Sequence, residues 1–380
     1  MKHFNMLTST DHEELFYKVP QSIGPFSPKR EIARALGATL YIPALKDRIG
    51  HRLMYQLPGL SSAVLCLEDS INDEDVQEAE AHLIQEVRSL RGLGIEKGDL
   101  PFLFIRVRNV EQMKRIAQEL KEVLHIITGF VFPKFCFRNG VTYLQELQTI
   151  NKQLNLQLYA MPIIETEEFL YKETRLQEMN SIRRLFDEYQ HLILNIRIGG
   201  TDLSGIYGMR RKFDSTIYDI SLLNDFIGDM VNFFGRNRGE YMISGPVWEF
   251  FDRKYPDTHT AITEGSPYVH GFIEEVQKDQ LNGLCGKTII HPSHIQLVNA
   301  MHVVSKEDYR DALEIVHKNG EGEENGVSIS PYANKMNEAK PHLRWAREII
   351  MKSNVYGVFH EDKSYVNLLE KECIPISNNG

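Results

Sequence analysis

The chain has 380 residues, of which 42% are hydrophobic and 25% are charged, and its formal net charge is −9. This composition is typical of a globular protein with a large core, and the negative charge argues against general binding to nucleic acid or to anionic membranes. Because no apolar run is long enough to cross a bilayer and the first residues lack the layout of a signal peptide, we expect a cytoplasmic protein.

The first 36 residues are polar and contain several prolines, which indicates an extension that packs over one end of the main domain. From residue 37 to 305, apolar runs typical of buried strands recur at fairly even spacing. There are eight of them, at residues 38–42, 63–67, 102–107, 129–133, 159–164, 192–198, 241–244 and 287–290.

Segments with helical periodicity separate these runs. In the clearest one, the apolar residues that share a helix face are Val76, Ala79, Leu83, Val87 and Leu90. Eight alternating strands and helices predict an α/β fold of the TIM-barrel type, with eight parallel strands inside a ring of helices. Residues 306–380 would follow the barrel as a helical segment and tail, with a hinge of glycines and acids at 320–326.

Two of the apolar runs end in a carboxylate. Glu165 follows the run at 159–164, and Asp202 follows the run at 192–198. Since TIM-barrel chemistry takes place where the strands end, the two carboxylates would belong to one site. Mg²⁺, or Mn²⁺ in its place, would suit them, because Mg²⁺ commonly takes one or two carboxylates and completes its shell with water and substrate oxygens. The alternative is a pair of solvated loop acids.

Other charged residues also stand at predicted strand ends. Glu68 and Asp69 follow the second run, Arg106 lies in the third, and Lys134 ends the fourth. A guanidinium group can hold a substrate carboxylate by two parallel hydrogen bonds, which an ammonium group cannot do. The alternative for Arg106 is a structural ion pair with Glu68 or Asp69.

A basic segment follows Asp202. It contains Arg210, Arg211 and Lys212 within the loop from 204 to 219. This segment is either an exposed basic turn or a loop that binds a phosphate or carboxylate of the substrate.

Seven short motifs, in this order, resemble those of the citrate lyase beta subunit-like enzymes of the HpcH/HpaI aldolase group, a branch of the pyruvate/phosphoenolpyruvate TIM-barrel superfamily. They are Leu40-Tyr-Ile-Pro-Ala44, Leu67-Glu-Asp-Ser70, Ile105-Arg-Val107, Phe132-Pro-Lys134, Ile163-Ile-Glu-Thr166, Gly200-Thr-Asp-Leu203 and Gly286-Lys-Thr-Ile-Ile-His-Pro292. The resemblance extends over about residues 37 to 350.

The resemblance implies a Mg²⁺-dependent lyase or aldolase that acts through an enolate on a carboxylated small molecule such as a keto acid, often with an acyl-CoA partner. It implies Glu165 and Asp202 as metal ligands and Arg106 as the residue that holds the substrate carboxylate. It places Glu68, Asp69 and Lys134 at the same mouth as further catalytic residues. Separately from the resemblance, we expect Arg108, Gly200, Thr201, Arg210 and Arg211 to contact the substrate. A cation beside an enolate oxygen would stabilise its charge.

Three residues depart from the family's usual motifs. Cys66 stands where the family has an aspartate, Arg108 where an asparagine is common, and Cys285 where an aspartate is often present. These changes favour a specialised branch of lyases whose acceptor differs from that of the citryl-CoA and malyl-CoA lyases.

Lyases of this group form trimers or hexamers in which the segment after the barrel covers a neighbour's active site. We therefore expect a homotrimer or hexamer. The apolar residues that would form its interface are Met336, Leu343, Trp345, Ile349 and Ile350.

Two other functions stay open. A strand-end lysine with a lowered pKa can attack a carbonyl, so Lys134 could make the chain a Schiff-base aldolase. Alternatively, the replaced acids at Cys66 and Cys285 would fit a non-catalytic relative that binds a metabolite or a partner protein.

Overall fold

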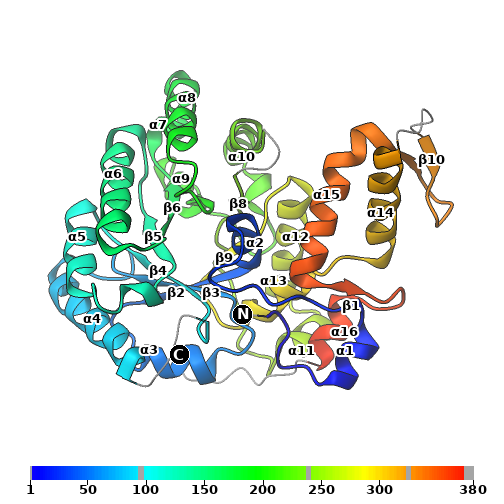
Figure 1. Ribbon diagram of the computed structural model, residues 1–380, viewed down its shortest axis with the longest axis horizontal. Coiled ribbons are helices and arrows are strands. Elements are labelled where there is room, and N and C mark those ends of the chain that lie inside the picture. The colour runs from blue at the N-terminus through cyan, green and yellow to red at the C-terminus, as the bar shows by residue number, and fades with distance from the viewer. Residues whose placement is uncertain (1, 93–97, 237–240, 322–326, 372–380) are drawn as a thin grey trace.

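Eight parallel strands form the centre of the computed structural model, which describes residues 2–92, 98–236, 241–321 and 327–371 (Figure 1). The strands are β2 (Ala38–Pro43), β3 (Ser62–Cys66), β4 (Phe102–Arg106), β5 (Gly129–Phe132), β6 (Tyr159–Ile164), β7 (Ile196–Ile198), β8 (Ile243–Ser244) and β9 (Lys287–Ile289). Those from β2 to β8 pair in chain order, and β9 pairs with β2. A parallel bridge between Gly245 and Lys287 joins β8 to β9, so the predicted TIM barrel is confirmed.

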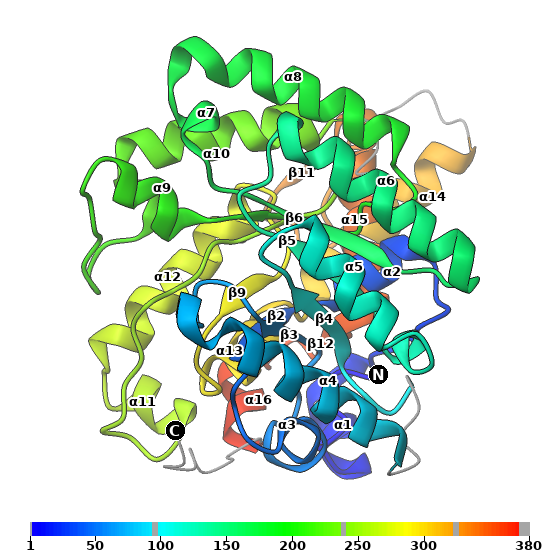
Figure 2. The same cartoon turned by 90° about the vertical axis from the view of Figure 1, so that its left-hand side faces the viewer.

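Helices and short helical turns connect the strands and surround the barrel (Figure 2). The longer ones are α4 (Val76–Gly92), α5 (Val110–Glu119), α6 (Phe137–Leu154), α8 (Lys172–Glu188), α10 (Ser221–Phe234) and α12 (Pro267–Leu281). The shorter ones are α3 (Ile49–His51), η1 (Arg52–Gln56), η2 (Asp73–Asp75), η3 (Leu124–Ile126), α7 (Glu167–Leu170), α9 (Gly200–Ile206), η4 (Ile217–Asp219), α11 (Thr258–Thr263) and α13 (His294–Met301). In α4, Ala79, Leu83, Val87 and Leu90 are buried, as the periodicity predicts.

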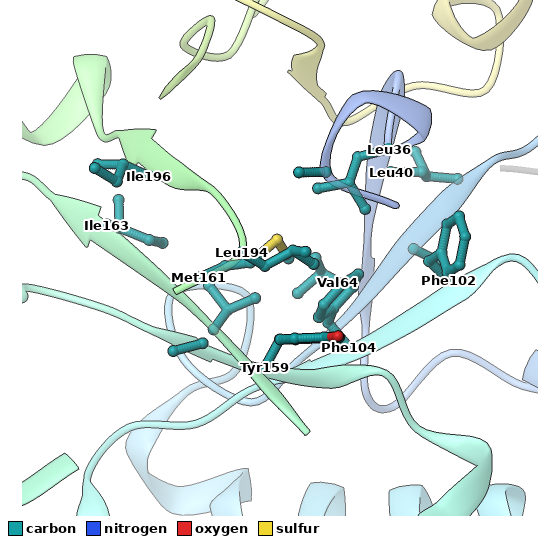
Figure 3. Close-up of a cluster of buried hydrophobic side chains, with 14 of the residues drawn as sticks. Leu36, Leu40, Val64, Phe102, Phe104, Tyr159, Met161, Ile163, Leu194 and Ile196 are labelled. Atoms are coloured by element: carbon teal, nitrogen blue, oxygen red, sulfur yellow. The ribbon is translucent and has the colours of Figure 1, made fainter. Parts of the chain in front are cut away.

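Buried apolar side chains from several strands pack together in the centre of the molecule (Figure 3). Phe104 of β4 and Met161 of β6 are both fully buried. Burial of one large apolar side chain contributes about 1.5–3 kcal/mol, so a core of this size holds the strands firmly. The groups at the strand ends therefore stand on a rigid support.

The segments before and after the barrel pack against each other. β1 (Phe16–Lys18) pairs antiparallel with β12 (Val358–Phe359), and the rings of Phe16 and Phe359 stack with their centroids 5.7 Å apart. α1 (Ser9–Leu15) contacts α16 (Tyr365–Lys371), and α2 (Lys29–Ala35) contacts α15 (Ala339–Tyr356). The domain boundaries at residues 36 and 305 stay a prediction, although the two flanking segments clearly share contacts.

A pair of helices, α14 (Lys306–Glu321) and α15, stands at the right-hand edge of Figure 1 with the hairpin of β10 (Val327–Ile329) and β11 (Met336–Glu338). Their shared core is Ala312, Ile315 and Ala346, and Ile349 and Ile350 pack against it within the same chain. Of the predicted hinge, residues 320 and 321 belong to α14, and 322–326 lie outside the described residues. Among the described helices, none is long and apolar enough to cross a membrane.

Candidate active site

Charged side chains from four neighbouring strands meet at one end of the barrel, which we call the mouth. Glu68 and Asp69 follow β3, Arg106 ends β4, Lys134 follows β5, and Glu165 follows β6. Because these strands are parallel and adjacent, their C-terminal ends lie side by side. The structure thus brings together the residues that the sequence predicts to be catalytic.

Arg106 contacts three carboxylates at the mouth. Its Nη2 lies 2.8 Å from Glu68 Oε2 and 3.3 Å from Glu165 Oε1, and its Nη1 lies 2.8 Å from Asp69 Oδ2. Although burial acts to lower the pKa of the guanidinium, the neighbouring acids, Glu165 first, raise it above its ordinary value. Arg106 therefore stays charged, and it pairs with Glu68 and Asp69, the alternative role expected for it.

Lys134 holds two of the same carboxylates by different groups. Its Nζ lies 2.9 Å from Glu68 Oε1, while its backbone N–H donates a hydrogen bond of 2.8 Å to Glu165 Oε1. The φ angle of Lys134 is 47°, an uncommon left-handed conformation for a residue other than glycine. The hydrogen bond to Glu68 raises the pKa of Lys134, so the amine is kept protonated.

The pKa values of Glu68 and Asp69 are shifted in opposite directions although the two residues are adjacent. Burial raises the pKa of Glu68, and the hydrogen bond with Asp69 adds to this effect. For Asp69, burial acts in the same direction, but the hydrogen bond with Glu68 and the charge of Arg106 together bring its pKa below the ordinary value. Two neighbouring carboxyl groups whose pKa values move apart are suited to act as acid and base.

Glu165 is a buried carboxylate that packs against Gly199. It is 5% exposed, and burial raises its pKa to about 7, with Asp202 adding to the rise and Arg106 opposing it. A Cβ atom on Gly199 would lie 2.1 Å from Glu165 Oε2, so only glycine leaves space for this carboxylate. The raised pKa means that negative charge on Glu165 is incompletely compensated by the protein.

Asp202 lies in the first turn of α9, just beyond β7. Burial raises its pKa, and the charge of Asp69 raises it further. Within the described part of the chain, no basic side chain comes within 4 Å of its carboxylate. Glu165 and Asp202 thus form a pair of acids with excess negative charge, which is the condition that a bound cation relieves.

The donor set at the mouth fits Mg²⁺ better than zinc. Among the residues that the structure describes, no group of three or more His, Cys, Asp or Glu side chains is arranged to hold a metal ion. Zinc sites normally use three or four protein ligands. Two carboxylates such as Glu165 and Asp202 suffice for Mg²⁺, because this ion keeps water and substrate oxygens as its other ligands.

Arg108 does not face the mouth as a free group. Its Nε donates to the carbonyl oxygen of Leu67 over 2.8 Å, its Nη2 donates to the carbonyl of Ile71, and its Nη1 pairs with Asp73. These contacts tie down the loop that carries Glu68. Arg108 thus has a structural role in this loop, and its predicted substrate contact stays a prediction.

The two arginines of the basic loop have opposite surroundings. The side chain of Arg211 is 4% exposed, pairs with the buried Glu275 and donates to the carbonyl of Val247. The side chain of Arg210 is 77% exposed and lies 3.9 Å from Glu249. Arg211 therefore anchors the loop, whereas Arg210 is free to reach a ligand, and substrate binding by either residue stays a prediction.

The remaining predicted contacts are Gly200 and Thr201. A Cβ atom on Gly200 would lie 2.6 Å from Ile217 Cδ1, so glycine permits the close packing of α9 against the following loop. Thr201 is exposed beside Asp202. Gly200 thus has a packing reason of its own, and Thr201 is available to a ligand.

Two residues that were not predicted to belong to the site, Tyr41 and Arg197, lie next to it. The Cζ atoms of Arg106 and Arg197 lie 6.0 Å and 5.8 Å from the ring centroid of Tyr41. A signal was present in the sequence, because Arg197 interrupts an otherwise apolar strand and Tyr41 belongs to the first of the seven motifs.

Comparison with known proteins agrees with this fold. A family model described as C–C bond lyase of the TIM-barrel fold matches residues 30–358. The protein CitE from Mycobacterium tuberculosis, in complex with magnesium, acetoacetate and coenzyme A, is similar in structure, with a TM-score of 0.54, 17% identity, and coverage of 84% of this chain and 99% of that chain. RipC from Yersinia pestis has a TM-score of 0.44 and 17% identity, and the match covers 70% of this chain and 94% of that chain. A lead(II) complex of malate synthase from Haloferax volcanii has a TM-score of 0.46, 13% identity, and coverage of 69% and 72%. No curated protein matches the sequence.

Proposed function

The chain belongs to the family of C–C bond lyases of the TIM-barrel fold, so it is an enzyme of the C–C lyase class. We propose that it forms or cleaves a C–C bond beside the carbonyl of a small keto acid with the aid of Mg²⁺. The observation that carries the proposal is the pair of strand-end acids with raised pKa values, Glu165 and Asp202, next to Arg106. The CitE complex with magnesium and acetoacetate supports the choice of metal and of substrate class. Mn²⁺ would be held by the same two carboxylates.

Cleavage of a C–C bond beside a carbonyl leaves negative charge on an enolate oxygen. When bound, Mg²⁺ supplies the positive charge that stabilises this oxygen. Arg106 would orient the substrate, because its buried Nε has no hydrogen-bond partner among the described residues and can donate to a substrate carboxylate. The metal ligands and the orienting cation would then act on adjacent parts of one small molecule.

Glu68 and Asp69 would move the proton of the substrate hydroxyl. In the cleavage direction, the ionised Asp69 takes this proton, the C–O bond becomes a carbonyl, and the electron pair of the breaking C–C bond forms the enolate. Glu68, whose pKa is raised, lies next to Asp69 and keeps Lys134 in place through their ion pair. The opposite pKa shifts of the two carboxyl groups support this division of roles.

The alternatives have less support. A Schiff base requires a neutral amine, and the ion pair with Glu68 raises the pKa of Lys134 instead of lowering it. A non-catalytic relative would not need the charged pair at Glu165 and Asp202.

Arg210 and Thr201 would contact the distal part of the substrate, such as a thioester or phosphate group.

We propose assembly into a homotrimer or hexamer on a separate observation. Ile329 and Met336 lie opposite each other in the hairpin of β10 and β11, and they are 66% and 57% exposed. An exposed apolar pair on a projecting hairpin is suited to contact another chain. Leu313 and Trp345 of the adjoining helices are exposed as well.

Exchange of the methyl protons of pyruvate in D₂O, followed by NMR, tests the proposed function, because it reports enolate formation whatever the second substrate is. We expect Mg²⁺-dependent exchange by the wild-type protein and its loss in Glu165→Gln. Glu167→Gln is a matched control, because Glu167 is an exposed acid two residues further along. Metal-independent exchange, or exchange retained in Glu165→Gln, would contradict the proposal.

A further inference from the structure

Arg197 is a buried cation in the interior of the barrel. It lies on β7 and is 1% exposed. Its Nη2 donates to Thr288 Oγ1 over 2.7 Å, and its Nη1 donates to Thr39 Oγ1 over 3.3 Å. Since these threonines lie on β9 and β2, which are not neighbours of β7 in the sheet, the side chain spans the interior.

Arg197 differs from Arg106 in having no acid beside it. In the described ranges of the chain, no carboxylate comes within 4 Å of its guanidinium, and its buried Nε has no hydrogen-bond partner. A buried charge without a counter-charge is unfavourable for folding. Such a residue is therefore better explained by a role in the site than by packing.

The group that connects Arg197 with the mouth is Tyr41. The Cζ atoms of Arg197 and Arg106 lie 5.8 Å and 6.0 Å from the Tyr41 ring centroid, and a hydrogen bond between the Arg197 guanidinium and the Tyr41 side chain contributes to the electrostatics of Arg197. The charge of Glu165 also acts on this phenol. When Arg197 donates to the hydroxyl oxygen, the hydroxyl proton of Tyr41 is left for another acceptor, and none of the described residues accepts it.

We propose that Tyr41 is a catalytic residue that donates its hydroxyl proton to the enolate, and that Arg197 is its positioning residue. This inference rests on the proposed function and deepens it, because it names the proton donor that the enolate requires. In the cleavage direction, the enolate carbon takes the proton from the Tyr41 hydroxyl while the electron pair of its C=C bond forms the new C–H bond. The resulting phenolate lies near both Arg106 and Arg197, which stabilise its charge, and it regains a proton from water.

The surroundings of Tyr41 suit a donor. Burial raises the pKa of its phenol, while Arg197 and Arg106 act in the opposite direction. The hydroxyl is therefore protonated at neutral pH, and the charge that it acquires on donation is met by two cations already in place.

Binding of oxalate in the presence of Mg²⁺ tests this role without turnover. Oxalate is a planar dianion that resembles the enolate of pyruvate, with an oxygen in place of the carbon that receives the proton. We expect calorimetry to show unchanged Mg²⁺ affinity in Tyr41→Phe and at least tenfold weaker oxalate binding. Tyr159→Phe is the matched control, because Tyr159 is a buried tyrosine at the start of β6 whose hydroxyl bonds Gln157. It should bind oxalate as the wild type does.

A double-mutant cycle tests the part of Arg197. If Arg197 acts through Tyr41, Arg197→Met weakens oxalate binding in the wild-type background but has no further effect in Tyr41→Phe. Arg197→Lys should restore part of the loss, because it keeps the charge. If Arg197→Met does not fold, the comparison of Tyr41→Phe with wild type decides the proposal alone.

Pyruvate exchange gives the second measurement. General acid catalysis typically contributes about 10²–10⁴-fold, so Tyr41→Phe should slow Mg²⁺-dependent exchange by that factor. Wild-type oxalate affinity together with a wild-type exchange rate in Tyr41→Phe would overturn the inference and leave the proposed function standing. A wild-type protein that binds neither Mg²⁺ nor oxalate would overturn both.

Discussion

Lys134 donates its backbone N–H to Glu165 Oε1 over a distance of 2.8 Å. The same oxygen lies 3.3 Å from Arg106 Nη2, so the protein itself occupies one oxygen of this carboxylate. The other oxygen, Oε2, faces Gly199. Lys134 and Arg106 thereby fix the orientation of Glu165 and leave one oxygen for a cation.

Gly199→Ala should weaken Mg²⁺ binding. A Cβ atom there would lie 2.1 Å from Glu165 Oε2, so the carboxylate must move away from its present position. We expect a loss of tenfold or more in affinity, which corresponds to about 1.4 kcal/mol. Titration calorimetry measures it, with Gly205→Ala as the control, because nothing lies within 4 Å of a Cβ atom on Gly205. Equal affinity in both variants would show that the metal does not use Oε2.

Arg106→Lys should weaken binding of a keto acid such as pyruvate. Lysine keeps the charge but has no N–H at the position of Arg106 Nε, the proposed donor to the carboxylate, so the expected loss is roughly 1.5–3 kcal/mol of binding free energy. The control is Arg115→Lys, which alters an exposed pair with Glu80 away from the mouth. Unchanged affinity for pyruvate in Arg106→Lys would rule out the proposed grip on the carboxylate.

The stability of the metal-free protein should depend on Glu165 between about pH 4.5 and 7. Its pKa is raised from 4.5 to about 7 in the folded state, so the fold favours the protonated form. This contribution is fully present below the unfolded-state pKa and is lost as the pH rises through the folded-state value. Relative to wild type, Glu165→Gln should therefore gain stability with rising pH, on the order of 3 kcal/mol.

Urea denaturation at pH 5 and pH 7.5 in the presence of EDTA measures this difference. Saturating Mg²⁺ should remove the pH-dependent loss of stability of the wild type, because the metal compensates the charge of the Glu165 carboxylate. A stability difference that does not change with pH would show that Glu165 has an ordinary pKa.

The hairpin of β10 and β11 should control assembly. Changing both Ile329 and Met336 to glutamate places like charges at the proposed interface. Because both side chains are exposed within one chain, the change should not disturb the fold of that chain. Light scattering should show a smaller particle with unchanged secondary structure. The matched control is Leu281→Glu, an exposed leucine on α12. A wild-type monomer, or a variant that assembles like the wild type, would contradict the proposal.

The barrel and much of the mouth could be predicted because both follow from local rules. Buried parallel strands give continuous apolar runs, and the ends of parallel strands lie together, so Glu68, Lys134 and Glu165 could be assigned to one site before any contact was known. The run at 192–198 is longer than β7, because only its last three residues pair regularly, while Ile193 forms an isolated bridge with Ala160.

Other features depend on tertiary contacts that leave no local pattern. Arg210 and Arg211 are identical neighbours, and tertiary partners such as the buried Glu275 on α12 distinguish the anchored side chain from the free one. The pairing of Phe16 with Phe359 likewise joins distant parts of the chain. Arg197 could have been noticed from the sequence, because side chains alternate along a strand and a charged residue in an apolar run can point into the barrel. The sequence could not show, however, that Arg197 has no acid partner.

Titration of Mg²⁺ into the metal-free protein tests the central claim most directly. We predict one binding site in the wild type and in Glu167→Gln, and loss of binding in Glu165→Gln and in Asp202→Asn, with all four proteins folded by circular dichroism. Wild-type Mg²⁺ affinity in both Glu165→Gln and Asp202→Asn would contradict the account, because the cation would then be held elsewhere.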